Sequence, residues 1–112
     1  MTITSETLEL AALAAGIELT YRRSSGVYYY DDPETGREEW RPHRDRADAV
    51  QLAFRRHFLV RIDTIEVEVI DVDGETTRVH HDDSYRSIEL AYCQALTLAA
   101  AAEGRRMREG GR

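Results

Sequence analysis

The chain contains no lysine, a single cysteine, two prolines and no long run of apolar residues. A membrane helix needs about 20 consecutive apolar residues, so we expect no membrane span. Residues 1–16 lack the basic and uninterrupted apolar regions of a secretion signal, which favours the cytoplasm. Cys93 alone permits no intramolecular disulfide, in agreement with a reducing compartment.

Positive charge is also scarce. Fifteen arginines stand against 21 acidic residues, which gives a net charge of −6. Affinity for nucleic acid comes largely from clustered basic residues, so this balance argues against direct nucleic-acid binding and favours a basic protein partner. A length of 112 residues is typical of one domain. We predict a single α+β domain over residues 1–104 and a basic, frayed tail over residues 105–112.

Hydrophobic periodicity predicts three helices and six strands. The first helix is expected from a Thr4 cap to Gly16, the second from Asp45 or Asp48 to residue 57, and the third from Asp83 or Ser84 to Glu103. Strands are expected at residues 17–22, 27–30, 37–41, 58–62, 65–72 and 75–81. The order is helix, three-stranded antiparallel meander, helix, second three-stranded meander and long C-terminal helix. We therefore predict an α+β fold packed as a sandwich.

Two packing details follow from the same periodicity. On the second helix, the predicted apolar stripe consists of Ala47, Val50, Phe54 and Phe58, with Leu52 and Ala53 beside it. In the fifth strand the apolar residues change face near residues 69 and 70. This change predicts either a β-bulge or a strand that is covered on both faces for part of its length, as helices on two sides of the sheet would achieve.

The stretch from Asp63 to Asp83 contains eight carboxylates and one base, Arg78. A row of carboxylates could bind in a protein groove that normally binds phosphates, because arginine and lysine side chains line such a groove. Equally, such carboxylates could simply keep a small domain soluble. The proposed partner-binding residues are Glu66, Glu68, Asp71, Asp73, Glu75, Asp82 and Asp83.

No catalytic signature accompanies these acids. His80, His81, Asp82 and Asp83 are potential metal ligands, but adjacent side chains in an extended segment point apart. We favour a polar strand end that leads into a helix cap, and expect neither metal nor cofactor. Cys93 lies near the apolar side of the last helix and is expected to be a buried small hydrophobe. The chain is predicted not to be an enzyme.

An aromatic group lies on the first meander, at residues 28–30 and Trp40. Residues 26–31 and 35–42 resemble the second and third strands of a WW domain, in which aromatic side chains form a groove for proline-rich peptides. The resemblance implies a groove formed by Tyr29 and Trp40. The alternative is that alternate tyrosines pack on the core and Trp40 covers a sheet edge. The aromatic residue expected near Ile17 or Leu19 in that family is absent.

A second resemblance covers more of the chain. The pieces at residues 8–12, 16–18, 27–28, 40–42, 45, 48–53 and 83–85 are similar to small phage and prophage proteins with a phage ABA-sandwich domain. That family supplies no catalytic residues to transfer. The resemblance implies a small protein made by a mobile element that acts on host machinery.

Together these patterns predict a non-enzymatic phage accessory protein that binds and inhibits a host protein or nucleoprotein complex. The specific expectation is counter-defence, such as anti-CRISPR or anti-restriction action, through an acidic surface that resembles nucleic acid. The alternative is a peptide-binding module that uses Tyr29 and Trp40. An alanine-rich last helix and an exposed strand edge also make a homodimer credible.

Overall fold

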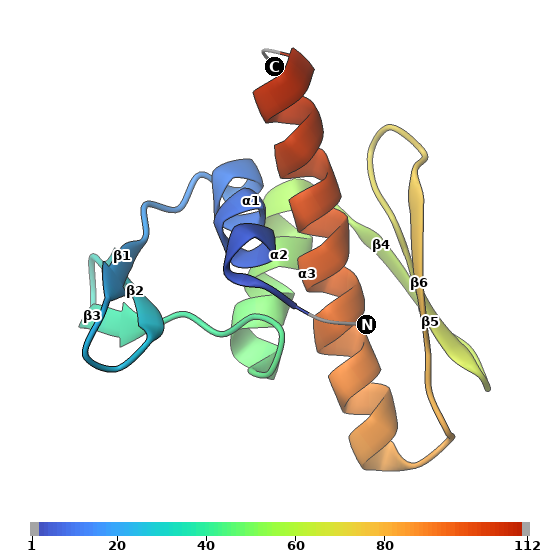
Figure 1. Cartoon of the computed structure of the whole chain (residues 1–112). Helices are drawn as coiled ribbons and strands as arrows, with labels where there is room; N and C mark the ends of the chain where they lie inside the picture. Colours follow the sequence, from blue (N-terminus) through green and yellow to red (C-terminus); the bar gives the residue numbers. More distant parts are fainter. Residues whose placement is uncertain (1–2, 111–112) are drawn as a thin grey trace.

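The computed structural model describes residues 3–110, and three helices lie between two antiparallel sheets (Figure 1). The observed order confirms the predicted α+β fold. Sheet A contains β1, β2 and β3 in that order, and sheet B contains β4, β5 and β6. The elements are α1 (Ser5–Ala15), β1 (Thr20–Arg22), β2 (Val27–Asp32), β3 (Gly36–Glu39), α2 (Arg46–Arg56), β4 (Leu59–Ile62), β5 (Glu66–Ile70), β6 (Thr76–His80) and α3 (Tyr85–Gly110).

The ends of α1 lie where the sequence predicts them. The Thr4 hydroxyl accepts from the Thr7 amide, and the Thr7 hydroxyl accepts from the Thr4 amide, so two otherwise unpaired donors are satisfied. Gly16 ends the helix in the left-handed conformation, with φ of 72°. This conformation carries little steric cost for glycine, which explains why the chain can turn there.

The buried face of α2 differs from the predicted stripe. Asp45 caps the helix, and Ala49 and Leu52 are its buried residues. Phe54 is 77% exposed, so the stripe through Phe54 is wrong. The helix packs through Ala49 and Leu52, and Phe54, although apolar and large, lies on the exposed side.

The helix α3 extends well past its predicted end. Ser84 caps it, because its hydroxyl accepts from the Ser87 amide at 3.2 Å. The helix continues through Gly104 to Gly110, so the predicted end at Glu103 is wrong. A Cβ at Gly104 would lie 1.9 Å from the carbonyl oxygen of Leu10, so this glycine permits the close approach of α1. Residues 111–112 of the expected tail lie outside the described residues.

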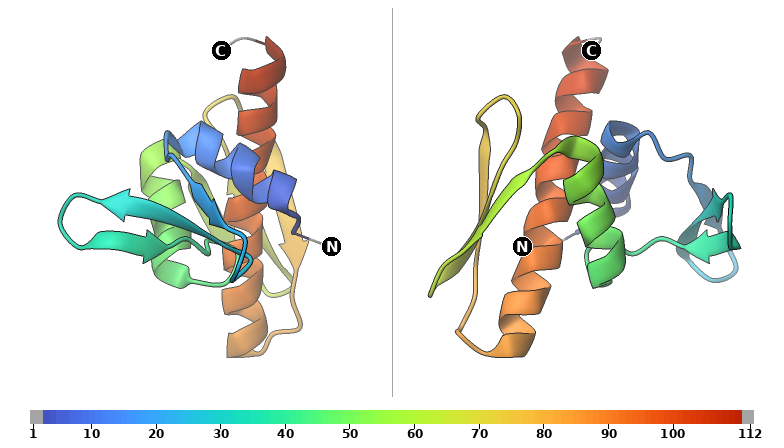
Figure 2. Two further views of the ribbon diagram at one scale, coloured as in Figure 1. Left: turned by 60° about the vertical axis from the view of Figure 1, so that its left-hand side comes forward. Right: turned by 180° about the vertical axis from the view of Figure 1, so that it is seen from behind.

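Sheet B packs one face against α3. The valines at 67, 69 and 79 are buried in a cluster with α3 residues such as Leu96, while no helix of the described residues covers the outer face (Figure 2). The register of β5 runs without interruption from Glu66 to Ile70 against β6 and from Val67 to Ile70 against β4. The predicted bulge is therefore wrong. Both faces of β5 are covered for part of its length, but Glu68 on the outer face is buried beneath arginines and not beneath a second helix. Within residues 3–110, no helix is both long and apolar enough to cross a bilayer.

Candidate functional site

The acidic stretch is distributed over three places on sheet B. Glu66 and Glu68 lie on the outer face of β5, where side chains alternate with the buried valines. A second group, Asp71, Asp73 and Glu75, surrounds the turn between β5 and β6. Asp82 and Asp83 follow β6 at the opposite end. The structure therefore does not place the seven predicted residues in one continuous row.

Arginines of the same chain neutralise the outer face. Arg61, Glu68 and Arg78 face one another across the three strands. Glu68 lies 3.2 Å from the Arg61 guanidinium and 2.8 Å from that of Arg78, and its side chain is only 8% exposed. Glu66 lies 3.3 Å from Arg78. These two carboxylates are already paired, which removes them from the predicted binding surface.

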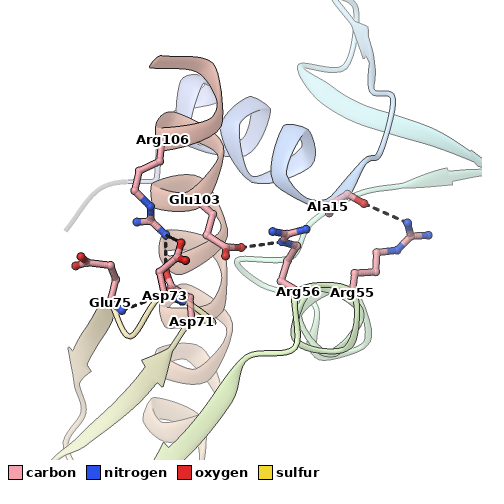
Figure 3. Close-up of polar contacts among 8 residues, drawn as sticks. All are labelled: Ala15, Arg55, Arg56, Asp71, Asp73, Glu75, Glu103 and Arg106. Carbon is pink, nitrogen blue, oxygen red and sulfur yellow. Dashed lines mark hydrogen bonds and ion pairs between the residues drawn. The ribbon is translucent and has the colours of Figure 1, made fainter. Parts of the chain in front are cut away.

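The turn between β5 and β6 is organised by Asp71 (Figure 3). One carboxylate oxygen accepts from the backbone amides of Asp73 at 2.9 Å and Glu75 at 3.0 Å. The other accepts from the Arg106 guanidinium at 2.5 Å. Because the Asp71 side chain is 3% exposed, it ties the hairpin to α3 and offers little to a partner. Arg106 also lies 3.6 Å from Asp73.

A second ion pair lies beside this one. Glu103, buried on α3, accepts from Arg56 of α2 at 2.7 Å (Figure 3). Carboxylate oxygens of Asp71, Asp73 and Glu103 lie within 4.8 Å of one another, a grouping that could hold a cation. Arg56 and Arg106 already supply positive charge there, and both line the adjoining cavity of about 310 Å³. We interpret the group as an ion-pair network that joins α2, α3 and sheet B.

Sequence reasoning missed the two α3 members of this network. Local periodicity predicts that the helix ends at Glu103 and places Arg106 in the tail. Their spacing of three residues places them on one side of a continued helix, and this was the available signal. The partner side chains are 35 and 47 residues distant in sequence, so periodicity could not identify them.

The end of sheet B that follows β6 carries exposed carboxylates. Hydrogen bonds from the Ser84 amide and hydroxyl to Asp82 lower the pKa of this carboxyl. Asp83 is exposed, with φ of 77°. Glu75, at the opposite end of β6, is exposed as well. In the described part of the chain, no arginine forms an ion pair with Glu75, Asp82 or Asp83.

The histidine and aspartate side chains that were considered as potential metal ligands do not converge. The His81 ring accepts from the Asp83 amide at 3.1 Å through Nδ1, so Nε2 donates to the Asp63 carbonyl oxygen at 2.8 Å. His80 points instead to the outer face, where it lies 3.6 Å from Glu66. Over residues 3–110, only Asp71, Asp73 and Glu103 gather closely enough to suggest a metal site. At Cys93, burial raises the pKa of the thiol to about 11, which disfavours the nucleophilic thiolate.

The predicted peptide groove is wrong for Trp40. This side chain is 1% exposed and packs among Leu10, Leu52 and Ala100 of the three helices, so it offers no surface to a peptide. Its indole N–H has no hydrogen-bond partner within the described chain. Tyr29 is half-buried, with the Arg22 guanidinium 5.3 Å from its ring centre. The aromatic group on sheet A therefore belongs mainly to the core.

Comparisons of the chain with protein-family models, with curated proteins and with solved structures give no match. The structure itself defines a small α+β protein whose buried charges are paired within the chain.

Proposed function

We propose that the chain is a non-enzymatic accessory protein of a phage or other mobile element that binds and inhibits a host protein complex. The specific role that we propose is counter-defence against a CRISPR or restriction system. The resemblance of the sequence to small phage proteins suggests the biological context. The observation that carries the binding role is the acidic edge, which we define as Glu75, Asp82 and Asp83 at the two ends of β6.

The acidic edge has the properties of a surface for a basic partner. All three carboxylates are exposed, whereas Glu66 and Glu68 are engaged by arginines of the chain. Unpaired exposed carboxylates attract a cationic surface over a distance set by the ionic strength. Glu75 and Asp82 are seven residues apart, which corresponds to about 23 Å of extended chain at 3.3 Å per residue. We therefore propose contacts with two basic patches rather than with one continuous phosphate groove.

The experiment is phage infection of a panel of bacterial strains, each carrying one active CRISPR or restriction system. Expression of the chain should restore plaque formation in at least one strain. The purified effector of that strain should bind the chain in competition with duplex DNA, and more weakly at high salt. Absence of protection throughout the panel would contradict the counter-defence role.

Matched charge variants test the surface. The triple variant Glu75→Gln, Asp82→Asn and Asp83→Asn should weaken binding and remove its salt dependence. The control neutralises three exposed carboxylates elsewhere, Glu18→Gln, Glu34→Gln and Glu38→Gln, and should bind as the unmodified chain does. Equal effects of the two triple variants would show that only net charge matters and would reject the acidic edge.

A further inference from the structure

The edge strand β4 has backbone groups that no other strand of the described residues pairs with. The Asp63 amide donates to the Glu66 carbonyl oxygen at 2.8 Å, which sets the hydrogen-bonding phase between β4 and β5. Bonded and non-bonded pairs alternate in an antiparallel ladder, so Leu59 and Arg61 bond to β5, while the backbone groups of Val60 and Ile62 point away from it. In the described part of the chain no strand lies beyond β4. Figure 2 shows this edge at the border of sheet B.

The same edge exposes large apolar side chains. Leu59 is 66% exposed and Ile62 is 54% exposed, on opposite faces of the strand. Ile62 also lines a hollow of about 170 Å³, whose other lining residues are Arg46, Tyr85, Ile88, Glu89 and Tyr92. By contrast, the opposite edge strand β6 is polar except for its buried valine. An edge with free backbone groups and exposed apolar residues is a template for another strand.

The charged residues on and directly after β4 indicate that the added strand is β4 of a second copy of the chain. In a symmetric dimer, a two-fold axis perpendicular to the sheet relates the two β4 strands. One residue of β4, the central residue, then lies opposite the same residue of the other copy. If Arg61 were the central residue, the two copies of Arg61 would place like charges opposite each other. If Val60 were the central residue, Leu59 of one copy would lie opposite Arg61 of the other. A centre at Ile62 places each Arg61 opposite Asp63 of the other copy, an arrangement of opposite charges.

The hydrogen-bonding phase agrees with the same centre. The backbone N–H and C=O of Ile62 point to the open edge, so the two copies of Ile62 can exchange both bonds. Their side chains would then meet on the face that carries the apolar hollow. We propose that the chain forms a homodimer in which β4 strands pair antiparallel with Ile62 opposite Ile62, extending sheet B to six strands. The acidic edge lies at β6, the opposite edge strand of sheet B, and does not take part in this contact.

Sedimentation over a range of protein concentrations tests this dimer. The unmodified chain should dimerise, and Ile62→Lys should raise the dimer dissociation constant by about ten-fold or more, because it places two cations at the centre. Asp63→Arg should also weaken the dimer by placing arginines opposite each other. The control Val72→Lys changes a residue that is 63% exposed at the far end of sheet B, and should leave dimerisation unchanged. A monomeric unmodified chain would overturn the proposal, as would a dimer indifferent to both edge variants.

Cysteine cross-linking tests the register. With Ile62→Cys, the two Cα atoms at the centre would lie about 5.5 Å apart, within the range that a disulfide bridges. Mild oxidation should therefore give a covalent dimer, whereas Thr64→Cys should not, because Thr64 lies opposite Val60. Cys93 is buried and serves as the unreactive internal control. Cross-linking at Thr64→Cys but not at Ile62→Cys would overturn the proposed register.

Discussion

Sheet A and sheet B have the same topology, but they are attached to the helices in different ways. Sheet B places three buried valines against α3 along much of its inner face. In sheet A, every residue of β1 is exposed, and its attachment depends on aromatic residues at its inner side, Tyr28 and Trp40. The comparison shows that alternating apolar residues define a meander, while the path of a neighbouring helix decides how much of it is buried.

The polar contacts that connect the two sheets to the helices also differ. Sheet B is joined to α3 by the ion pair between Asp71 and Arg106. Sheet A is joined to α1 by the hydroxyl of Tyr28, which donates to Glu9 at 2.5 Å. Burial, reinforced by this hydrogen bond, raises the pKa of Tyr28. The connection of sheet B is therefore a pair of opposite charges, whereas the hydroxyl of Tyr28 that connects sheet A is a neutral donor.

The largest effect is expected from breaking the attachment of sheet A. Trp40→Ala should reduce the free energy of unfolding by about 3–5 kcal/mol, because it leaves a cavity among the helices. Urea denaturation followed by circular dichroism measures the change. Trp40→Phe should cost less, since the removed indole N–H has no partner in the described chain. Similar losses in the two variants would mean that the indole N–H, and not side-chain volume, matters at this position.

A somewhat smaller effect is expected from the helix contact on which both sheets depend. Glycine to alanine in an exposed helix gains about 1 kcal/mol. Gly104→Ala should instead lose about 2–3 kcal/mol, because the new Cβ meets the backbone of Leu10. Thermal unfolding shows whether Gly104→Ala lowers or raises the stability of the chain. Arg105→Ala, at the next and exposed position, is the control and should be nearly neutral. A stabilised Gly104→Ala variant would contradict the close approach of α1 and α3.

The smallest of the three effects concerns the charged connection of sheet B. Arg106→Met leaves the buried carboxylate of Asp71 with only its backbone donors, and should cost about 1–2 kcal/mol. The control Arg105→Met breaks an exposed contact with Glu6 and should cost under about 0.5 kcal/mol. Combining Arg106→Met with Asp71→Asn should cost less than the sum of the single changes. Additive losses would mean that the two side chains do not interact.

The sequence was sufficient for features governed by neighbouring residues. The cap at Thr4, the left-handed Gly16 and the order of the nine elements follow from local periodicity and local hydrogen bonding. The interior position of Gly104 could not be predicted in this way. A glycine favours a helix end in isolation, and only the proximity of Leu10 explains why the helix continues.

The candidate site was harder to predict for a related reason. A count of charges along residues 63–83 leaves out Arg61 and Arg106, which lie outside this stretch in the sequence. In the folded chain, Arg61 pairs with Glu68 and Arg106 pairs with Asp71. Similarly, an aromatic motif cannot distinguish a groove from a core. Trp40 became a core residue because three helices converge on it.

The position of Trp40 also makes the chain its own fluorescent reporter. As the sole tryptophan, it lies between sheet A and the helices, far along the chain from the valines of sheet B. Its emission should therefore report when sheet A separates from the helices and should be insensitive to opening of the other meander alone. Emission and backbone dichroism recorded together would reveal whether the two halves of the molecule unfold in one step or in two.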